Sequence, residues 1–434
     1  MEKDKKIKHA IKVKSFENSY KTKNEGEGCL SFWGLSNSLF NIRDYLKYNI
    51  ISLNYKFTPN EKSIMQIFNK SYSSINSDFI NQKLNQLIYI SYRNNYKPQI
   101  NSKNKSIYNS DCGWGCMIRS SQMILARAIY KIFKYEEGLN GKKIDKNQLI
   151  KKVIYYFLDN DLILSENDKE NTGKYFGMDN YISKLKEYNK KSKRKKGEIY
   201  AFEPPFSIQK ICIIGEILGK TCGEWFSDFD LPKIFNMIND YFDVFPQIKI
   251  SHYNSNLVLN DFFNKYAKEI SEEEEEKNNE NEKYVIFDNK KYTFKKMAII
   301  FISLRLGLQS ISEEYFPSIK KLFDCKEFLG FIGGRVQSAS YFFGYVNDDL
   351  LFMDPHYNQN SVKDLEAEGI SSYVNKIIYK LPLTKLQTAL TLGFLIRNSK
   401  EFIDFLKFCS LVSQDENSAF YISGIKNLDI IDKE

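Results

Sequence analysis

The stretch DCGWGCMIRSSQMILARAIYKIF, residues 111–133, joins a glycine-rich turn to a long apolar segment. Gly113 and Gly115 allow a sharp bend just before Cys116, because glycine accepts backbone angles that other residues avoid. The apolar residues after the turn have the dense spacing of a buried helix face: Met123, Ile124, Ala126, Ala128, Ile129, Ile132 and Phe133. The stretch therefore predicts a buried helix that begins at Cys116, with a thiol at its N-terminus.

A thiol in this position has the surroundings that a nucleophile needs. The partial positive charge of a helix N-terminus lowers the pKa of a nearby thiol. Backbone N–H groups at the same place can receive an oxyanion. A glycine-rich turn with one buried, inert cysteine is nevertheless the more common structure for such a short pattern. The stretch alone therefore suggests catalysis by Cys116, and a partner base is needed to decide.

The chain offers three histidines as a possible base, namely His9, His252 and His356. Only His356 has an acidic residue beside it, in the sequence LLFMDPH that ends with Asp354, Pro355 and His356. In an extended segment, residues i and i+2 lie on the same face, and proline fixes its own φ. Asp354 can thus orient the imidazole of His356 and leave its other nitrogen facing a thiol. This favours a catalytic triad over an incidental Asp-Pro turn.

The composition limits the class of protein. A chain of 434 residues with 42% hydrophobic and 15% aromatic residues can bury a large core and is not a disordered protein. Its net charge of +9 comes from basic and acidic runs that are partly segregated, which does not indicate a nucleic-acid partner. The N-terminus lacks the apolar segment of a secretory signal, and the seven cysteines form no C-x-x-C pair. We expect a reduced, cytoplasmic protein.

Short apolar runs rich in β-branched and aromatic residues predict strands in the C-terminal half, and helical patterns lie between and before them. The expected strands are residues 297–304, 328–334, 341–346 and 350–356, with a further strand just before Ser399. The expected helices are residues 78–90, residues 312–324 and a segment that begins at Ser399. This order indicates an α+β or α/β protein with a largely antiparallel sheet.

The charge distribution suggests the organisation of the chain. Residues 1–28 are predicted to be a mobile basic arm, residues 29–420 one folded domain, and residues 421–434 a C-terminal tail. Two charged segments, near 160–200 and 269–290, are predicted to be surface insertions, because they include the runs KKSKRKK and SEEEEEKNNENEK.

Several segments in the same order resemble the autophagins, the cysteine peptidases of autophagy that cleave a ubiquitin-like modifier. SDCGWGCMIRSSQMILA is similar to the nucleophile segment of that family. LGFIGGRVQSASYFFGYVNDDLLFMDPHYNQ is similar to its Asp-Pro-His segment. Further similarity lies in SYRNNYKPQI, FSIQKICIIGEILGKTCGEWF and ISLRLGL, so that the resemblance spans roughly residues 78–410.

The resemblance implies a papain-like α+β fold, with Cys116 on a helical part and Asp354 and His356 on a mainly antiparallel sheet. It implies that Tyr92 helps to form an oxyanion hole with the backbone N–H of Cys116, next to Gly115, and that Trp225 covers the channel for the substrate's tail. From the residues alone, either aromatic would be assigned to the core.

The activity implied is that of a thiol endopeptidase, which cleaves the modifier precursor after its C-terminal glycine and releases the modifier from phosphatidylethanolamine. The expected partner is that modifier, and contact with membranes is transient and made through the substrate. We expect a monomer that needs neither a cofactor nor a metal.

Three alternatives remain at this stage. The chain can be a papain-fold peptidase that acts on another ubiquitin-like protein, although the GEWF segment at 223–226 argues against this. It can be an inactive relative that only binds the modifier, although Cys116, His356 and Asp354 are all present. A metal site formed by Cys112, Cys116 and His356 lacks a convincing fourth ligand.

Overall fold

The helix predicted from the glycine-rich turn is present in the computed structural model of the chain. It extends over Cys116–Leu139 (α4) and buries its apolar face, as the periodicity predicts. The structure describes residues 55–57, 64–72, 87–141, 145–159, 204–271, 284–308, 310–335, 338–374 and 377–430. The predicted arm, the insertion near 160–200, most of the acidic run and His9 lie outside these residues.

The main sheet has the strand order β16-β14-β13-β12-β17-β11-β6, and β1 and β2 continue it beside β13. Its strands are β1 (Met65–Ile67), β2 (Lys70–Tyr72), β6 (Ile248–Asn254), β11 (Met297–Arg305), β12 (Phe328–Arg335), β13 (Ser338–Val346), β14 (Asp349–Met353), β16 (Tyr379–Pro382) and β17 (Ala389–Ile396). All pairings in this sheet are antiparallel except that of β6 with β11. The predicted α+β fold with a mainly antiparallel sheet is confirmed.

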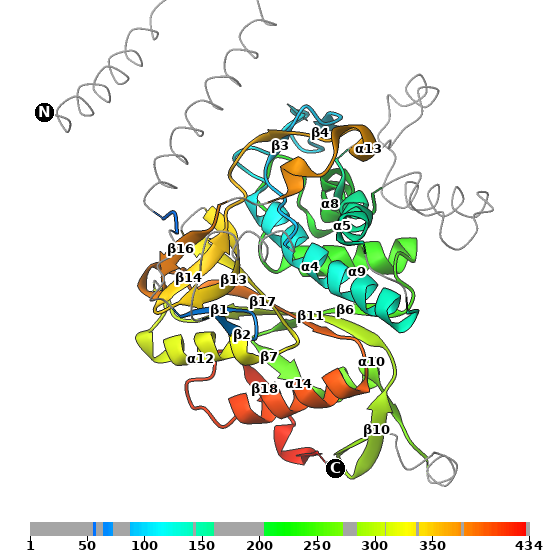
Figure 1. Ribbon diagram of the computed structural model, residues 1–434, viewed down its shortest axis with the longest axis vertical. Helices are drawn as coiled ribbons and strands as arrows, with labels where there is room; N and C mark the ends of the chain where they lie inside the picture. The colour runs from blue at the N-terminus through cyan, green and yellow to red at the C-terminus, as the bar shows by residue number, and fades with distance from the viewer. Residues whose placement is uncertain are drawn as a thin grey trace, which may run out of the picture. The chain divides into compact units, whose positions relative to one another are not determined.

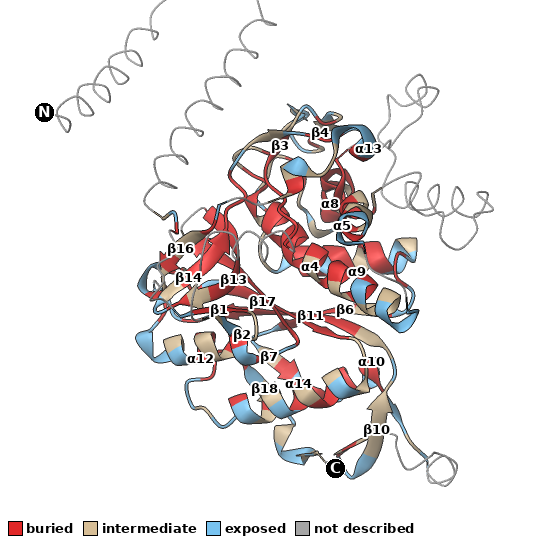
Figure 2. Cartoon of the chain, in the orientation of Figure 1, coloured by how far each residue is buried: buried red, intermediate tan, exposed pale blue. Residues whose placement is uncertain are grey.

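Helices cover both faces of this sheet (Figure 1). One face packs against α4 and α9 (Asp230–Phe242), and α5 (Lys146–Ile154) and α8 (Ile208–Gly215) pack in turn against these two helices. The other packs against α10 (Leu259–Tyr266), α12 (Phe316–Lys321) and α14 (Ser399–Val412). Strand β11 follows the period of two that an extended chain requires, since Ile299 and Phe301 face the first layer and Ile300 and Ile302 the second. Figure 2 accordingly shows buried residues along the strands and exposed ones on the outer sides of α12 and α14.

Shorter elements complete the described part of the chain. They are β3 (Arg93–Asn94), β4 (Gln99–Ile100), β5 (Ile107–Tyr108), β7 (Asn256–Val258), β8 (Ala267–Glu269), β9 (Val285–Phe287), β10 (Lys290–Phe294), β15 (Gln359–Asn360), α13 (Leu365–Glu368), β18 (Tyr421–Ser423) and β19 (Leu428–Asp429). β18 pairs with β7 and β19 with β9, so that residues within the predicted tail join the folded body. Strands β9 and β10 likewise begin within the predicted acidic insertion.

The predicted elements of the C-terminal half are present, including a helix that begins at Ser399. The helix predicted at 78–90 is wrong over its described residues 87–90, which are not helical. Ile88 instead forms a bridge with Val374, because tertiary pairing outweighs the local apolar periodicity here. Within the described residues, no helix combines the length and apolar character required to cross a bilayer.

Gly330 marks a point where β12 requires glycine. Its φ is +102°, at an irregularity between β12 and β17, and an added Cβ would lie 2.3 Å from the carbonyl oxygen of Phe342. Gly330→Ala should therefore lower the free energy of unfolding by about 2 kcal/mol or more. Urea denaturation measures this. Gly138→Ala is the matched control, because nothing lies within 4 Å of the added methyl group in a helix and alanine favours the helix. Equal effects of the two substitutions would contradict the assignment.

Candidate active site

The turn before α4 is held by Asp111. The carbonyl oxygen of Asp111 accepts hydrogen bonds from the N–H groups of Trp114 at 3.2 Å and Gly115 at 2.8 Å. Gly113 has φ +87°, in the left-handed region that favours glycine. A Cβ on Gly115 would lie 2.2 Å from Oδ2 of Asp111, so that a side chain has no room there. Both glycines are thus required for the close turn that delivers Cys116 to the helix N-terminus.

The Asp111 side chain is the centre of a buried ionic cluster. Arg119, one turn into α4, donates from Nε to Oδ2 of Asp111 at 2.8 Å and from Nη2 to Oδ1 at 3.0 Å. Its Nη1 pairs with Oδ2 of Asp159 at 2.9 Å, and Asp159 also accepts from the N–H of Ile208 at the start of α8. The Arg93 N–H donates to Oδ1 of Asp111 at 2.7 Å. One carboxylate therefore fixes α4 to the strand segment around residue 93.

The Asp-Pro-His segment follows directly after β14 and lies against the segment of Tyr92. The N–H of Tyr92 donates to the carbonyl oxygen of Pro355 at 2.8 Å. The hydroxyl of Tyr89 donates to the backbone carbonyl oxygen of Asp354 at 2.7 Å. Just beyond, β3 and β15 pair in parallel. Arg93, buried over the ring of Tyr373, extends this junction by donating to the carbonyl oxygens of Asn360 and Ser372. The same short segment thus positions both Cys116 and His356.

The predicted triad residues meet at this junction. His356 hydrogen-bonds through Nδ1 to Oδ1 of Asp354, and its backbone N–H donates to the same oxygen at 3.1 Å. The thiol of Cys116, which is only 8% exposed, lies close enough to the imidazole for each group to shift the pKa of the other. Because Nδ1 is taken by the carboxylate, the other ring nitrogen is the one that faces sulfur. Cys116, His356 and Asp354 are thus arranged as nucleophile, base and orienting acid.

The electrostatics of the three groups favour charge separation. Burial raises the pKa of the Cys116 thiol, but hydrogen bonds from His356 and Tyr92 and the imidazolium charge lower it below the ordinary value. Burial lowers the pKa of His356, yet the Asp354 carboxylate and the thiolate raise it to about 10. The pKa of Asp354 is lowered, since the imidazolium outweighs the effect of burial. The two shifts together favour the thiolate–imidazolium pair over the neutral thiol–imidazole pair.

The two predicted substrate-binding aromatics differ in their position relative to this pair. The ring of Tyr92 meets that of His356 edge-on, with centroids 5.3 Å apart, and its hydroxyl bonds the Cys116 sulfur. Trp225 is 48% exposed and donates from its indole nitrogen to the carbonyl oxygen of Gly113 at 2.8 Å. Tyr92 is thus within the site, whereas Trp225 presents a ring to solvent above the turn that carries Cys116.

His252 belongs to a different part of the sheet. It lies on β6, where Nε2 is 2.9 Å from Oγ of Ser303 and the ring packs against Phe229. Burial, with Lys233 nearby, lowers its pKa to about 4. A histidine that stays neutral in this way is a structural residue of the sheet. In the described part of the chain, no group of three or more His, Cys, Asp or Glu side chains could hold a metal ion.

The sequence patterns predicted no role for Asp111, Arg119, Asp159 or Arg93. A signal existed for Arg119, because it interrupts an otherwise apolar helix face and must find a buried counter-charge. Its partner Asp111 lies eight residues earlier, beyond the glycine turn. No local pattern could identify Asp159 or the contact of Arg93 with Ser372, since these residues come together only in the folded chain.

The chain is similar to known proteins over most of its length. Residues 77–408 match the Peptidase C54 catalytic domain. The chain is 24% identical over 361 residues to the cysteine protease ATG4B of Xenopus laevis. This alignment covers 82% of this chain and 81% of that protein. It is 26% identical over 347 residues to the cysteine protease ATG4C of the same organism, in an alignment that covers 75% of this chain and 67% of that protein. A shorter alignment of 130 residues shows 33% identity to the cysteine protease atg4 of Dictyostelium discoideum. It covers 30% of this chain and 17% of that protein.

The buried cluster should be essential to stability. Asp111→Asn removes one of the two carboxylates that compensate the buried Arg119, so the free energy of unfolding should fall by about 3 kcal/mol. Urea denaturation with circular dichroism measures the change. Asp348→Asn is the control, because its pair with Lys320 is exposed and should contribute less than about 1 kcal/mol. A loss no larger than that of the control would show that the cluster is dispensable.

The ion pair should be visible in the reactivity of the thiol. An ordinary thiol with a pKa near 8.5 is alkylated slowly below neutral pH, because little thiolate is present. Cys116 should react rapidly with iodoacetamide at about pH 6, and His356→Ala should move the rate profile to higher pH. Peptide mapping identifies the alkylated residue, and Cys116→Ala provides the blank. A profile that His356→Ala leaves unchanged would exclude the imidazole as the cause.

Proposed function

Given that this chain belongs to the peptidase C54 family and is a cysteine peptidase of autophagy, we propose that it cleaves a ubiquitin-like modifier after a C-terminal glycine. The observation that carries the proposal is the series Cys116–His356–Asp354, in which His356 is hydrogen-bonded to Asp354 and shifts the pKa of Cys116, assembled at a helix N-terminus from segments far apart in sequence. The expected partner is the autophagy modifier, in its precursor form and when joined to phosphatidylethanolamine. The protein would act in the cytoplasm as a monomer.

In the first half of the proposed reaction, the Cys116 thiolate attacks the carbonyl carbon of the substrate glycine. The developing oxyanion would receive hydrogen bonds from the backbone N–H of Cys116 and from the Tyr92 hydroxyl. The first N–H groups of a helix have no acceptor within the helix. The N–H group of Cys116 is therefore available to bind the oxyanion. His356 then gives its proton to the leaving amine as the C–N bond breaks, which yields a thioester on Cys116.

In the second half, neutral His356 takes a proton from water as the hydroxide attacks the thioester carbonyl. The C–S bond breaks, the modifier leaves with a C-terminal carboxylate, and the thiolate–imidazolium pair is restored. Asp354 holds the imidazole in one tautomer throughout and stabilises its charged form. The rate should rise with pH as the thiolate forms and fall as His356 loses its proton on the alkaline side.

Trp225 supports the proposed restriction to glycine. Its ring is fixed by the hydrogen bond to Gly113, one of the turn residues beside the nucleophile. We propose that this ring covers the channel for the substrate's tail and leaves no room for a side chain at the cleaved residue. The same channel would admit the modifier when its glycine is joined to phosphatidylethanolamine, which gives the protein a second, delipidating activity. Contact with the membrane would then be made through the substrate.

The decisive experiment uses a modifier precursor that extends beyond its glycine. Incubation with the protein should release a product whose mass corresponds to scission after that glycine. The same precursor with alanine in place of the glycine is the matched control, and its cleavage should fall at least 100-fold because the added methyl group does not fit beneath Trp225. Binding without scission would support the inactive relative, and cleavage of other ubiquitin-like proteins alone would support a different substrate.

Variants of the triad test the roles in the same assay. Cys116→Ala should abolish turnover, and His356→Ala should be nearly as severe, because each removes a group that takes part in bond breaking. Asp354→Asn should lose roughly 10⁴-fold and keep a residual rate, since nucleophile and base remain. His252→Ala should leave kcat close to that of the wild type. Loss of turnover in a folded His252→Ala protein, with activity kept in His356→Ala, would identify a different base.

A further inference from the structure

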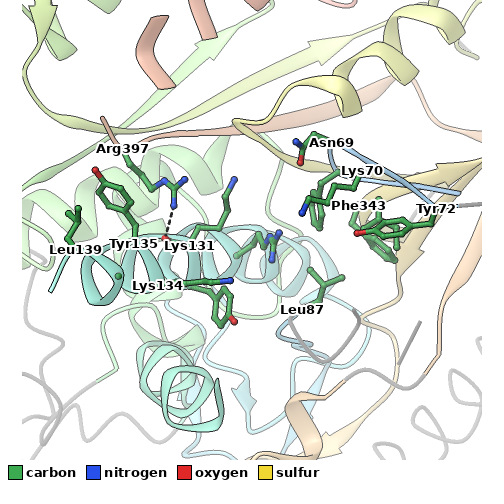
Figure 3. Close-up of a pocket in the computed structure, with 15 residues that line it drawn as sticks. Asn69, Lys70, Tyr72, Leu87, Lys131, Lys134, Tyr135, Leu139, Phe343 and Arg397 are labelled. Atoms are coloured by element: carbon green, nitrogen blue, oxygen red, sulfur yellow. Dashed lines mark hydrogen bonds between the residues drawn. The ribbon is translucent and has the colours of Figure 1, made fainter. Parts of the chain in front are cut away.

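A cavity of about 570 Å³ lies between the C-terminal half of α4 and the hairpin formed by β1 and β2. Five cationic side chains line it: Lys70, Arg127, Lys131, Lys134 and Arg397. Figure 3 shows Lys131 and Lys134 on the helix side of the cavity and Lys70, with Tyr72, across from them. The positive charges thus come from three separate segments and converge on one space.

Most of these charges have no counter-charge among the residues that the structure describes. Arg397 pairs with Glu401 and donates to the carbonyl oxygen of Lys131 at 3.1 Å. Lys131 donates to a carbonyl oxygen, that of Lys326, at 3.2 Å, which does not compensate its charge. Within the described residues, Lys70, Arg127 and Lys134 have no carboxylate within ion-pairing distance.

The cations repel one another, which lowers the pKa of neighbouring lysines. Burial, with Arg127 and Arg397 nearby, lowers the pKa of Lys131 to about 8, and the carboxylates Glu401 and Glu327 only partly oppose this. Burial and four neighbouring cations, Arg127 first, also lower the pKa of Lys134. A bound anion would relieve this mutual repulsion. The cavity therefore has a standing electrostatic preference for negative charge.

Aromatic rings fix the two guanidinium groups at the cavity wall. Arg127 lies over the ring of Phe68 at 4.3 Å from its centroid, and Arg397 over that of Tyr135 at 4.9 Å. Nε of Arg127 is buried and has no hydrogen-bond acceptor among the described residues. A planar guanidinium held in this way, with a donor left unsatisfied, suits the oxygens of a phosphate group.

We propose that this cavity binds a compact polyanion that carries several phosphate groups, such as an inositol polyphosphate or the headgroup of a phosphoinositide lipid. Four uncompensated cations match two or more phosphate groups better than a single carboxylate. The site is separate from the active site, since Arg127 lies eleven residues after Cys116, about 16 Å along the helix at 1.5 Å per residue. It is therefore independent of the proposed peptidase activity.

Isothermal titration of the full-length protein with inositol hexakisphosphate tests the site. Saturable binding with one ligand per chain is expected, with affinity that falls as salt rises. Lys70→Gln/Lys134→Gln should weaken binding at least tenfold, and because both side chains are exposed the protein should remain folded. Lys233→Gln/Lys426→Gln is the matched control, which removes the same charge from exposed positions outside the cavity. Arg127→Gln provides a second variant within it.

Vesicles distinguish the two sources of the phosphate groups. Phosphatidylcholine vesicles with and without phosphatidylinositol 4,5-bisphosphate are sedimented with the protein and with each variant. Binding to the phosphoinositide vesicles that the cavity variants lose and the control keeps assigns the site to a lipid headgroup. Saturable binding of the soluble polyphosphate alone, with the same dependence on the variants, assigns it to a soluble ligand. Absence of both, or equal weakening by cavity and control variants, would overturn the proposal. Turnover of precursor should be unchanged in the Lys70→Gln/Lys134→Gln protein.

Discussion

The arrangement of the active site depends on one buried carboxylate, that of Asp111. Arg119 could not be buried in α4 without it, because an isolated charge in the interior is strongly disfavoured. By binding Arg119 and the Arg93 N–H together, Asp111 joins the helix of the nucleophile to the segment that contacts the Asp-Pro-His turn. The relative position of thiol and imidazole thus depends on satisfying a buried charge as well as on the packing of apolar groups.

The two halves of the site bring different properties to the chemistry. The helical layer supplies a thiol at a helix N-terminus, next to N–H groups without intrahelical acceptors. The sheet supplies Asp354 and His356 just after β14, a strand whose residues 350–353 are buried. Both members of the ion pair are nearly excluded from water, and each compensates the cost of burying the other. The reactive state is therefore prepared before a substrate arrives.

Helix α4 links two regions of different character. Arg119 in its first turn pairs with buried carboxylates beside the thiol, whereas Arg127, Lys131 and Lys134 further along the helix line a cavity without equivalent acids among the described residues. The helix is continuous over its 24 residues, so the two regions are separated along its length. A polyanion in the cavity would lie on the same layer as the nucleophile without touching it.

The sequence by itself determined the helix that begins at Cys116, the strands of the C-terminal half, and the pairing of Asp354 with His356. These follow from apolar periodicity, glycine placement and the spacing of near neighbours, all of which are local properties. The helix expected at residues 78–90 is absent from its described residues 87–90, because Ile88 pairs with Val374. Only the tertiary structure decided that Asp159 and Asp111 share Arg119, that Arg93 binds Ser372, and that cations from three segments face one cavity. Buried charges are compensated by whichever group folding brings within a few ångströms, and no local pattern records that distance.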